Sequence, residues 1–230
     1  MRPLLVLLLT LATQFVSAQI DTHLEFPLDE NPVADRTQTL RDLQSGVRAV
    51  QTGLPALGIE ILLPLTQNEF LTEEEQNRAF LSLLTALIQL DRPAVVIQLL
   101  RERGPPRTPS IRLRWAMAEF LLGNTTQAQN RLRGMTPESL SAADLPWFYL
   151  IQSLLADRRD SPETSAEYFG LAIESTNSPF LLDTFDAIRA RLDILRGRVD
   201  EATVISLKNQ YELAVALPLR LQLAREYALV

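Results

Sequence analysis

Apolar residues recur every three to four positions from Ala34 onward, with polar residues between them. This spacing places the apolar side chains on one face of an α-helix, because a helical turn takes about 3.6 residues. Proline, glycine and aspartate interrupt the pattern at intervals. The pattern predicts an all-α fold in which consecutive helices form pairs, at residues 36–67, 73–103, 109–134, 142–175 and 180–209.

The turn inside each predicted pair carries a glycine or an aspartate. These turn residues are Gly53, Asp91, Gly123, Asp160 and Gly197, which are 38, 32, 37 and 37 residues apart. A period of 20 to 50 residues is the sequence signature of a repeat architecture. We therefore interpret the chain as imperfect copies of one helix pair.

Two further columns of residues follow the same register. Small side chains predominate five residues after the turn residue, at Gly58, Val96, Ala128, Ser165 and Ala202. Apolar side chains predominate nine residues after it, at Leu62, Leu100, Leu132, Phe169 and Ser206. A small residue lets two helices approach closely, and a larger apolar residue one turn later fills the space beyond. Both columns predict tight packing within each pair.

Several helix starts agree with this register. Thr72 followed by Glu75 predicts a capping box, in which each side chain binds the other residue's backbone N–H. Thr108, Ser161 and Ser178 each precede a proline, which favours a cap residue followed by proline at the first helical position.

The pattern resembles the tetratricopeptide repeat family, whose units pair two antiparallel helices. The segments GNTTQAQNRL at 123–132 and GRVDEATVIS at 197–206 match the family's turn and second helix. Trp115 and Ala116 suit the large and small positions of its first helix. The resemblance implies a superhelical array, or α-solenoid, over residues 34–230, with about five repeats and a partial sixth. Other helical-hairpin repeat families remain near alternatives.

The chain departs from the family pattern in two first helices. Glu119 and Asp193 stand where the family usually has an aromatic residue. Residues 217–230 resemble the first helix of a sixth repeat, which would place its turn glycine one residue beyond Val230. We expect the repeat domain to be incomplete at this end, or its apolar end to be covered by a partner or by self-association.

The first 18 residues have the features of a secretory signal peptide. Arg2 precedes an apolar run over residues 4–11, and small residues stand at Val16 and Ala18. A membrane anchor is the alternative, but the run is shorter than the roughly 20 residues that a helical span needs. We expect cleavage after Ala18, secretion or a periplasmic location, and no membrane span in the mature chain. Residues 19–33 are expected to form an extended tether.

Composition narrows the classes of partner and chemistry. The formal net charge is -6, which argues against nucleic acid as a partner. The chain has no cysteine, so it forms neither disulfides nor thiolate metal sites. Its single histidine, His23, lies in the predicted tether and is expected to be solvated. We expect no metal ion and no cofactor.

No known catalytic motif is present, so we do not expect an enzyme. The acidic run at residues 73–75 is interpreted as favouring the dipole at a helix start. Glu138 and Ser139 could resemble the glutamate-serine pair of lytic transglycosylases, but a helix-start role is favoured. Six aromatic residues at helical spacing are expected to lie in the core: Trp115, Trp147, Phe148, Tyr149, Phe169 and Phe185.

The resemblance implies that a binding groove would lie on the concave side, which the first helices form. The register then nominates seven candidate binding residues: Arg78, Thr85, Gln89, Trp147, Arg158, Thr184 and Arg191. Our leading hypothesis is an exported, non-enzymatic scaffold that binds a protein or peptide partner. The alternative is the N-terminal helical superstructure of a larger cell-envelope enzyme, such as a lytic transglycosylase, with its catalytic part beyond Val230.

Overall fold

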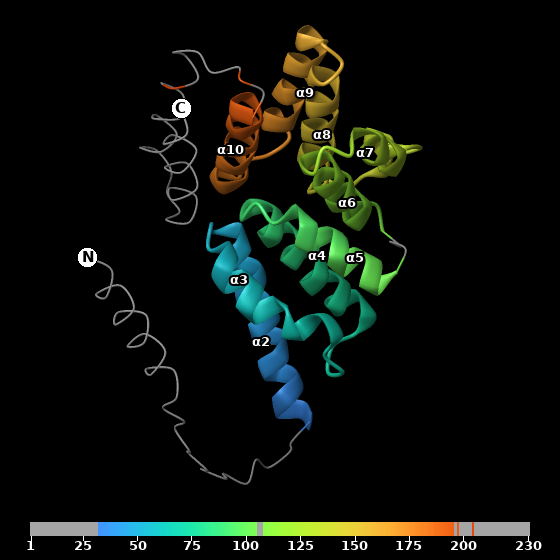
Figure 1. Ribbon diagram of the computed structural model, residues 1–230. Helices are drawn as coiled ribbons and strands as arrows, with labels where there is room; N and C mark the ends of the chain where they lie inside the picture. The colour runs from blue at the N-terminus through green and yellow to red at the C-terminus, as the bar shows by residue number, and fades with distance from the viewer. Residues whose placement is uncertain (1–31, 105–107, 196, 198–203, 205–230) are drawn as a thin grey trace, which may run out of the picture. The chain divides into compact units, whose positions relative to one another are not determined.

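The computed structural model describes residues 32–104, 108–195, 197 and 204. This part of the chain is all-α, as the sequence predicts, and it contains no strand (Figure 1). Two short 3₁₀ helices, Pro64–Gln67 and Pro137–Ser139, lie between α-helices. The nine described α-helices are α2 (Pro32–Gln51), α3 (Pro55–Leu62), α4 (Glu73–Gln89), α5 (Pro93–Arg103), α6 (Pro109–Leu121), α7 (Thr125–Leu132), α8 (Leu145–Asp157), α9 (Pro162–Glu174) and α10 (Pro179–Leu195).

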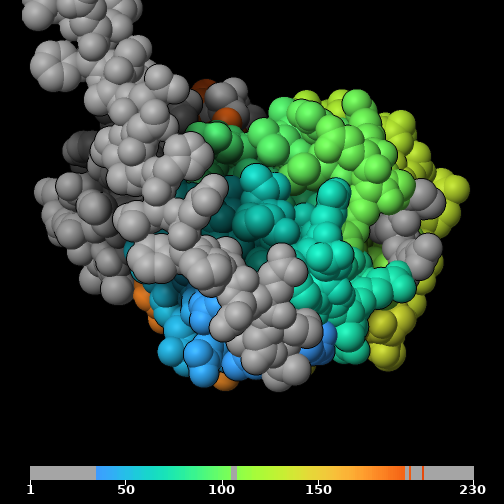
Figure 2. Space-filling view, turned by 90° about the horizontal axis from the view of Figure 1, so that it is seen from below, coloured from blue at the N-terminus to red at the C-terminus, as the bar shows by residue number. Residues whose placement is uncertain are grey.

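Consecutive helices pack as pairs, which confirms the predicted pairing over this part of the chain. The pairs are α2 with α3, α4 with α5, α6 with α7 and α8 with α9. We call α2, α4, α6, α8 and α10 the first helices, and α3, α5, α7 and α9 the second helices. First helices also pack along the series, α2 on α4, α4 on α6 and α6 on α8. Figure 2 shows chain order on one face, where the blue residues of α2 lie beside teal and then green segments.

The five predicted turn residues all have the same unusual backbone conformation. Their φ angles are positive, in the left-handed region that glycine enters freely and aspartate tolerates. The values are 77° at Gly53, 57° at Asp91, 84° at Gly123, 55° at Asp160 and 65° at Gly197. The predicted turn positions are therefore correct.

Four of these turns also share the same backbone hydrogen bond. The backbone N–H after the turn residue donates to the carbonyl five residues earlier, which is the longer bond of a Schellman motif. The N···O distances are 2.8 Å from Leu54, 2.8 Å from Arg92, 2.9 Å from Asn124 and 3.2 Å from Ser161. One hydrogen-bonded turn is thus repeated along the chain.

The two predicted packing columns are confirmed within the described residues. Gly58, Val96, Ala128 and Ser165 are all buried. Nine residues after the turns, Leu62, Leu100 and Leu132 are also buried, and Phe169 is half-buried against the core. A Cβ atom on Gly58 would lie 2.5 Å from Cγ2 of Val50, so α2 and α3 approach closely because this position is glycine. Ala202, Ser206 and the partial sixth repeat lie outside the described residues.

Most predicted helix starts agree with the structure. Thr72 forms the predicted capping box, since its N–H donates to Oε2 of Glu75 at 2.7 Å and its Oγ1 accepts from the N–H of Glu75 at 3.3 Å. Thr108 and Ser178 also accept a backbone N–H with their side chains. Ser161 precedes α9, but its side chain makes no capping hydrogen bond, so that detail of the prediction is wrong. Helix α2 begins at Pro32, four residues before its predicted start.

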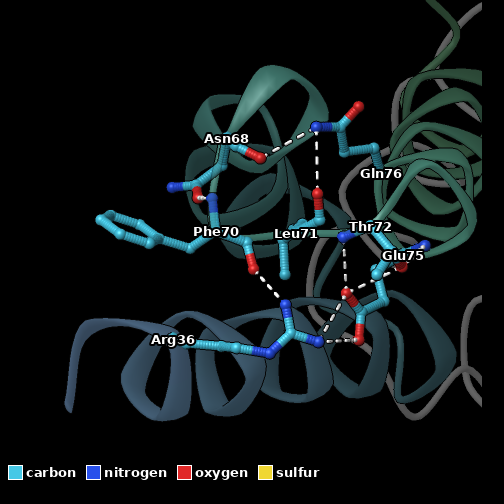
Figure 3. Close-up of polar contacts among 7 residues, drawn as sticks. All are labelled: Arg36, Asn68, Phe70, Leu71, Thr72, Glu75 and Gln76. Atoms are coloured by element: carbon cyan, nitrogen blue, oxygen red, sulfur yellow. Dashed lines mark hydrogen bonds and ion pairs between the residues drawn. The ribbon is translucent and has the colours of Figure 1, made fainter. Parts of the chain in front are cut away.

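A polar cluster fastens α2 to the start of α4 (Figure 3). Arg36 donates from Nη1 to the carbonyl oxygen of Phe70 at 2.5 Å and from Nη2 to both carboxylate oxygens of Glu75 at 3.3 and 3.4 Å. Gln76 donates to the carbonyl oxygen of Asn68 at 2.9 Å. These bonds hold the connection between the first two pairs and orient α4 beside α2.

The aromatic residues lie in the core, as the sequence predicts. Trp115, Trp147, Phe148 and Phe185 are buried, and Tyr149 and Phe169 pack against the core while half-buried. Within the described part of the chain, no helix is both long enough and apolar enough to cross a membrane. The predicted signal peptide and most of the predicted tether, residues 1–31, lie outside the described residues.

Candidate binding pocket

A pocket with a volume of about 620 Å³ is lined by all five first helices. Its lining comes from the last turns of α2, the length of α4, one residue of α6, the start of α8 with the loop before it, and the start of α10 with the segment that joins α9 to α10. This volume lies in the range of about 300–1,000 Å³ that is typical of ligand pockets. The first helices thus enclose a space large enough for a few side chains of a partner.

The pocket combines apolar walls with a small number of polar groups. Its large apolar residues are Val47, Val50, Leu81, Pro146, Trp147, Phe180 and Leu181. Among the described residues, Arg78 and Arg114 are the only charged residues in the lining. A pocket with two arginines and no carboxylate stands out in a chain whose net charge is -6. This lining is complementary to a ligand that carries negative charge and apolar groups.

Arg114 is the most deeply placed charge of the pocket, with only 5% of its surface exposed. Its Nη1 donates to Oδ1 of Asp144 at 3.0 Å, and its Nε donates to Oγ1 of Thr85 at 3.3 Å. The guanidinium carbon lies 4.6 Å from the centre of the Trp147 ring, in a cation–π arrangement. Contacts from α4, α8 and the loop before α8 therefore hold the side chain in one orientation.

Burial changes the acidity of Arg114 without removing its charge at neutral pH. Loss of hydration lowers the pKa of its guanidinium to about 10, while the carboxylate of Asp144 opposes this shift. The group thus remains protonated at pH 7. A cation in a region of low water content interacts more strongly with an opposite charge than the same cation in water.

Asp144 is itself held by two hydroxyl groups. Its Oδ2 accepts hydrogen bonds from Oγ of Ser110 and from Oγ of Ser141, each at 2.7 Å. Asp144 is 3% exposed and joins α6 to the loop before α8 through Arg114 and Ser110. These four residues form one polar cluster, which we call the Arg114–Asp144 cluster; Arg114 and Asp144 are buried, Ser110 is half-buried and Ser141 is exposed.

Gln89 adds an unsatisfied acceptor to the pocket. Its Oε1 atom is buried, yet it accepts no hydrogen bond from the described residues. Gln89 lies four residues after Thr85, about 6 Å further along α4. Most buried polar atoms in folded proteins have a hydrogen-bond partner, so such an exception needs an explanation. Because the atom itself is buried, a ligand N–H group in the pocket would reach it only after the Gln89 side chain turns toward the pocket.

The structure brings together four of the seven residues nominated from the sequence. Arg78, Thr85, Gln89 and Trp147 line the pocket. The other three do not: Arg158 is exposed at the end of α8, Thr184 is buried and donates to the carbonyl oxygen of Phe180, and Arg191 forms an ion pair with Asp91.

Arg114 was missed by the sequence reasoning, although a signal was present. The nominated residues stand 13, 6 or 2 positions before their turn residue, whereas Arg114 stands nine before Gly123. Ser82 stands nine before Asp91, and it also lines the pocket. Treating this position as a further column would have found both. The contribution of Phe180 and Leu181 had no such signal, because it depends on how distant helix pairs meet.

Other acidic motifs have structural roles. Residues 73–75 occupy the first turn of α4, as expected for a favourable dipole interaction. Ser139 accepts from the N–H of Thr136 and donates to its carbonyl oxygen, so Ser139 stabilises the short 3₁₀ helix that Pro137 begins. Within the described part of the chain, no group of three acidic or histidine side chains is placed to hold a metal ion.

Glu119 shows how the chain departs from the expected aromatic residue. It is buried, and its carboxylate accepts hydrogen bonds from Nε1 of Trp115 at 3.0 Å and from Nδ2 of Asn124 at 2.8 Å. It therefore links α6 to the turn that follows.

Comparisons with protein-family models, with curated proteins and with solved structures each found no match to this chain.

Proposed function

We propose that this protein is an exported, non-enzymatic scaffold that binds a partner protein through the surface formed by its first helices. In this proposal the helix pairs stack as a tetratricopeptide-like solenoid, and the pocket lies on its concave side. The observation that carries the proposal is the pocket itself, since residues from five first helices contribute to one cavity. Extended surfaces made from many repeats are suited to protein partners.

The repeated turn supports the solenoid part of the proposal. Four turns share a left-handed residue and the same hydrogen bond, and small or apolar residues are buried at fixed positions after them. Neighbouring pairs contact each other along the series, as expected when each unit buries an apolar face that it cannot cover alone.

Export rests on the sequence of residues 1–18, and the mature chain would begin at Gln19.

Site-specific photocrosslinking in the source cells would test the function. A benzoylphenylalanine at Gln51, an exposed residue of the pocket lining, is expected to crosslink to a discrete protein partner. The matched control carries the same group at Glu60, which is exposed on α3 and does not line the pocket. N-terminal sequencing of the purified chain is expected to begin at Gln19.

The two crosslinking positions give opposite expected results. A product from Gln51 that unlabelled protein competes away, with none from Glu60, would support binding through the first helices. Equal products from both positions, or none from Gln51, would contradict it. An intact Met1 on the purified protein would contradict export.

A further inference from the structure

The pocket has an open cationic group at its most buried side chain. Arg114 uses Nε and Nη1 for Thr85 and Asp144, whereas its Nη2 donates to no described residue. A guanidinium carries two N–H donors on each Nη, so both donors of Nη2 remain for a ligand. Because Arg114 lines the pocket and its orientation is fixed by its contacts, these donors are available without a change of rotamer.

The neighbouring groups define what a ligand needs. Arg78 adds a second cation to the lining, and no carboxylate of a described residue lines the pocket. The buried Oε1 of Gln89 needs an N–H donor and lies about one helical turn from Thr85, which contacts Arg114. Phe180 and Leu181, which are half-buried, provide apolar surface. A suitable ligand therefore combines an anion, an N–H group and an apolar group.

We propose that the pocket binds an internal segment of a partner protein in which an acidic side chain adjoins an apolar one. The carboxylate accepts from Nη2 of Arg114, a backbone N–H of the segment donates to Oε1 of Gln89 once that side chain turns toward the pocket, and the apolar side chain packs against Phe180 and Leu181. Arginine suits this task because its planar fork matches a carboxylate. This inference rests on the proposed protein-binding function and specifies the partner's chemistry.

Capped peptides that differ in one group test the inference. The first is acetyl-Gly-Leu-Glu-Leu-Gly-amide, and the second replaces glutamate by glutamine, which has the same shape without the charge. The chain holds two tryptophans, so ¹⁵N-labelled indole groups give two NMR signals, assigned with Trp115→Phe. Trp147 lines the pocket, while Trp115 donates to Glu119 outside it and serves as an internal control.

The glutamate peptide is expected to shift the Trp147 signal and leave that of Trp115 unchanged, and to bind at least tenfold more tightly than the glutamine peptide. Equal affinity of the two peptides, or no shift with either, would overturn the inference. A larger shift from free acetyl-leucine or from inorganic phosphate would also overturn it, because the pocket would then recognise a terminal carboxylate or a phosphate.

Two variants locate the binding groups while keeping the fold testable. Gln89→Glu places a negative charge in the pocket, which repels the carboxylate of the glutamate peptide. The affinity for this peptide is therefore expected to fall at least tenfold. Arg114→Lys keeps a cation beside Asp144 but removes the fork, and a loss of similar size is expected. Arg92→Gln, an exposed arginine outside the pocket, is the matched control and should bind normally. Unchanged binding by a folded Gln89→Glu protein would overturn the inference.

The two proposals fail in different ways. A specific crosslink from Gln51 with equal affinity for both peptides would retain the scaffold function and remove the acidic-segment inference. Selective binding of the glutamate peptide without any crosslinked protein would show an anion-selective pocket and contradict the scaffold function.

Discussion

The first and second helices of the pairs differ in how much of their surface is buried. In α6 and α8, buried residues occupy most positions, including the charged Arg114 and Glu119 of α6. In α7 and α9, only two residues of each helix are buried. Position in the series contributes to this difference, since α4 and α6 contact the first helices on either side, the second helix of their own pair and the second helix of the preceding pair. A second helix such as α3 or α5 packs mainly on the first helix of its own pair and on that of the next pair, so it has fewer neighbouring helices to match.

The largest effect is expected where a first helix buries charge. Asp144→Ala would leave the guanidinium of Arg114 buried without its counter-ion, and breaking a buried pair in this way typically costs about 3–5 kcal/mol of unfolding free energy. Urea denaturation followed by circular dichroism measures this. The exposed Arg101→Met in α5 is the matched control from a second helix and should change stability by less than about 0.5 kcal/mol.

A double variant separates the charge effect from a packing effect. Arg114→Met with Asp144→Leu removes both charges and keeps apolar volume, so it is expected to be more stable than Asp144→Ala alone. If the double variant were the less stable of the two, the unpaired charge of Arg114 would not be the main cause of the loss in Asp144→Ala, because both variants lack the hydrogen bonds of Asp144.

The same leucine substitution in the two kinds of helix gives the next comparison. Leu83 in α4 is 1% exposed, and Leu83→Ala should lower the unfolding free energy by about 2–5 kcal/mol through lost burial and a cavity. Leu57 in α3 is 46% exposed, so Leu57→Ala should lie within about 0.5 kcal/mol of the wild type. Similar losses in both variants, measured by urea denaturation, would show that Leu57 is covered in solution.

The smallest effect concerns a carboxyl group on α10. Burial raises the pKa of Asp186 above its ordinary value of 3.8. The positive charge of Arg189 lowers this pKa in part, and the negative charge of Asp183 raises it further. Between pH 3.8 and the raised pKa the folded state holds more protons, so stability from this group falls as pH rises. Asp186→Asn should therefore raise thermal stability at pH 7 by less than about 1 kcal/mol, since the group is partly hydrated, and the gain should vanish below pH 3.8.

The control for this pH effect comes from a second helix. Glu174→Gln changes an exposed carboxylate at the end of α9 and should leave the pH dependence of the melting temperature nearly unchanged. A gain for Asp186→Asn that persisted at pH 3 would mean that the aspartate destabilises the helix by its shape and not by its charge.

The repeat register was predictable because the properties behind it are local. A left-handed residue ends a helix wherever it stands, so Gly53 and Asp160 mark turns without reference to distant residues. The spacing from Gly123 to Ala128 and Leu132 likewise follows from helical geometry. The four nominated residues that line the pocket rested on the same geometry: Arg78, Thr85, Gln89 and Trp147.

The sequence by itself determined the all-α class, the pairing of helices, their turns and the residues that each pair buries, because these depend on contacts between residues close in the chain. Only the tertiary structure decided the pocket. Phe180 and Val47 both line it, and Arg114 reaches Asp144, because helices of different pairs are oriented by contacts such as that of Trp147 with Phe185. Such orientations depend on side-chain packing between pairs, which periodicity along the chain does not encode.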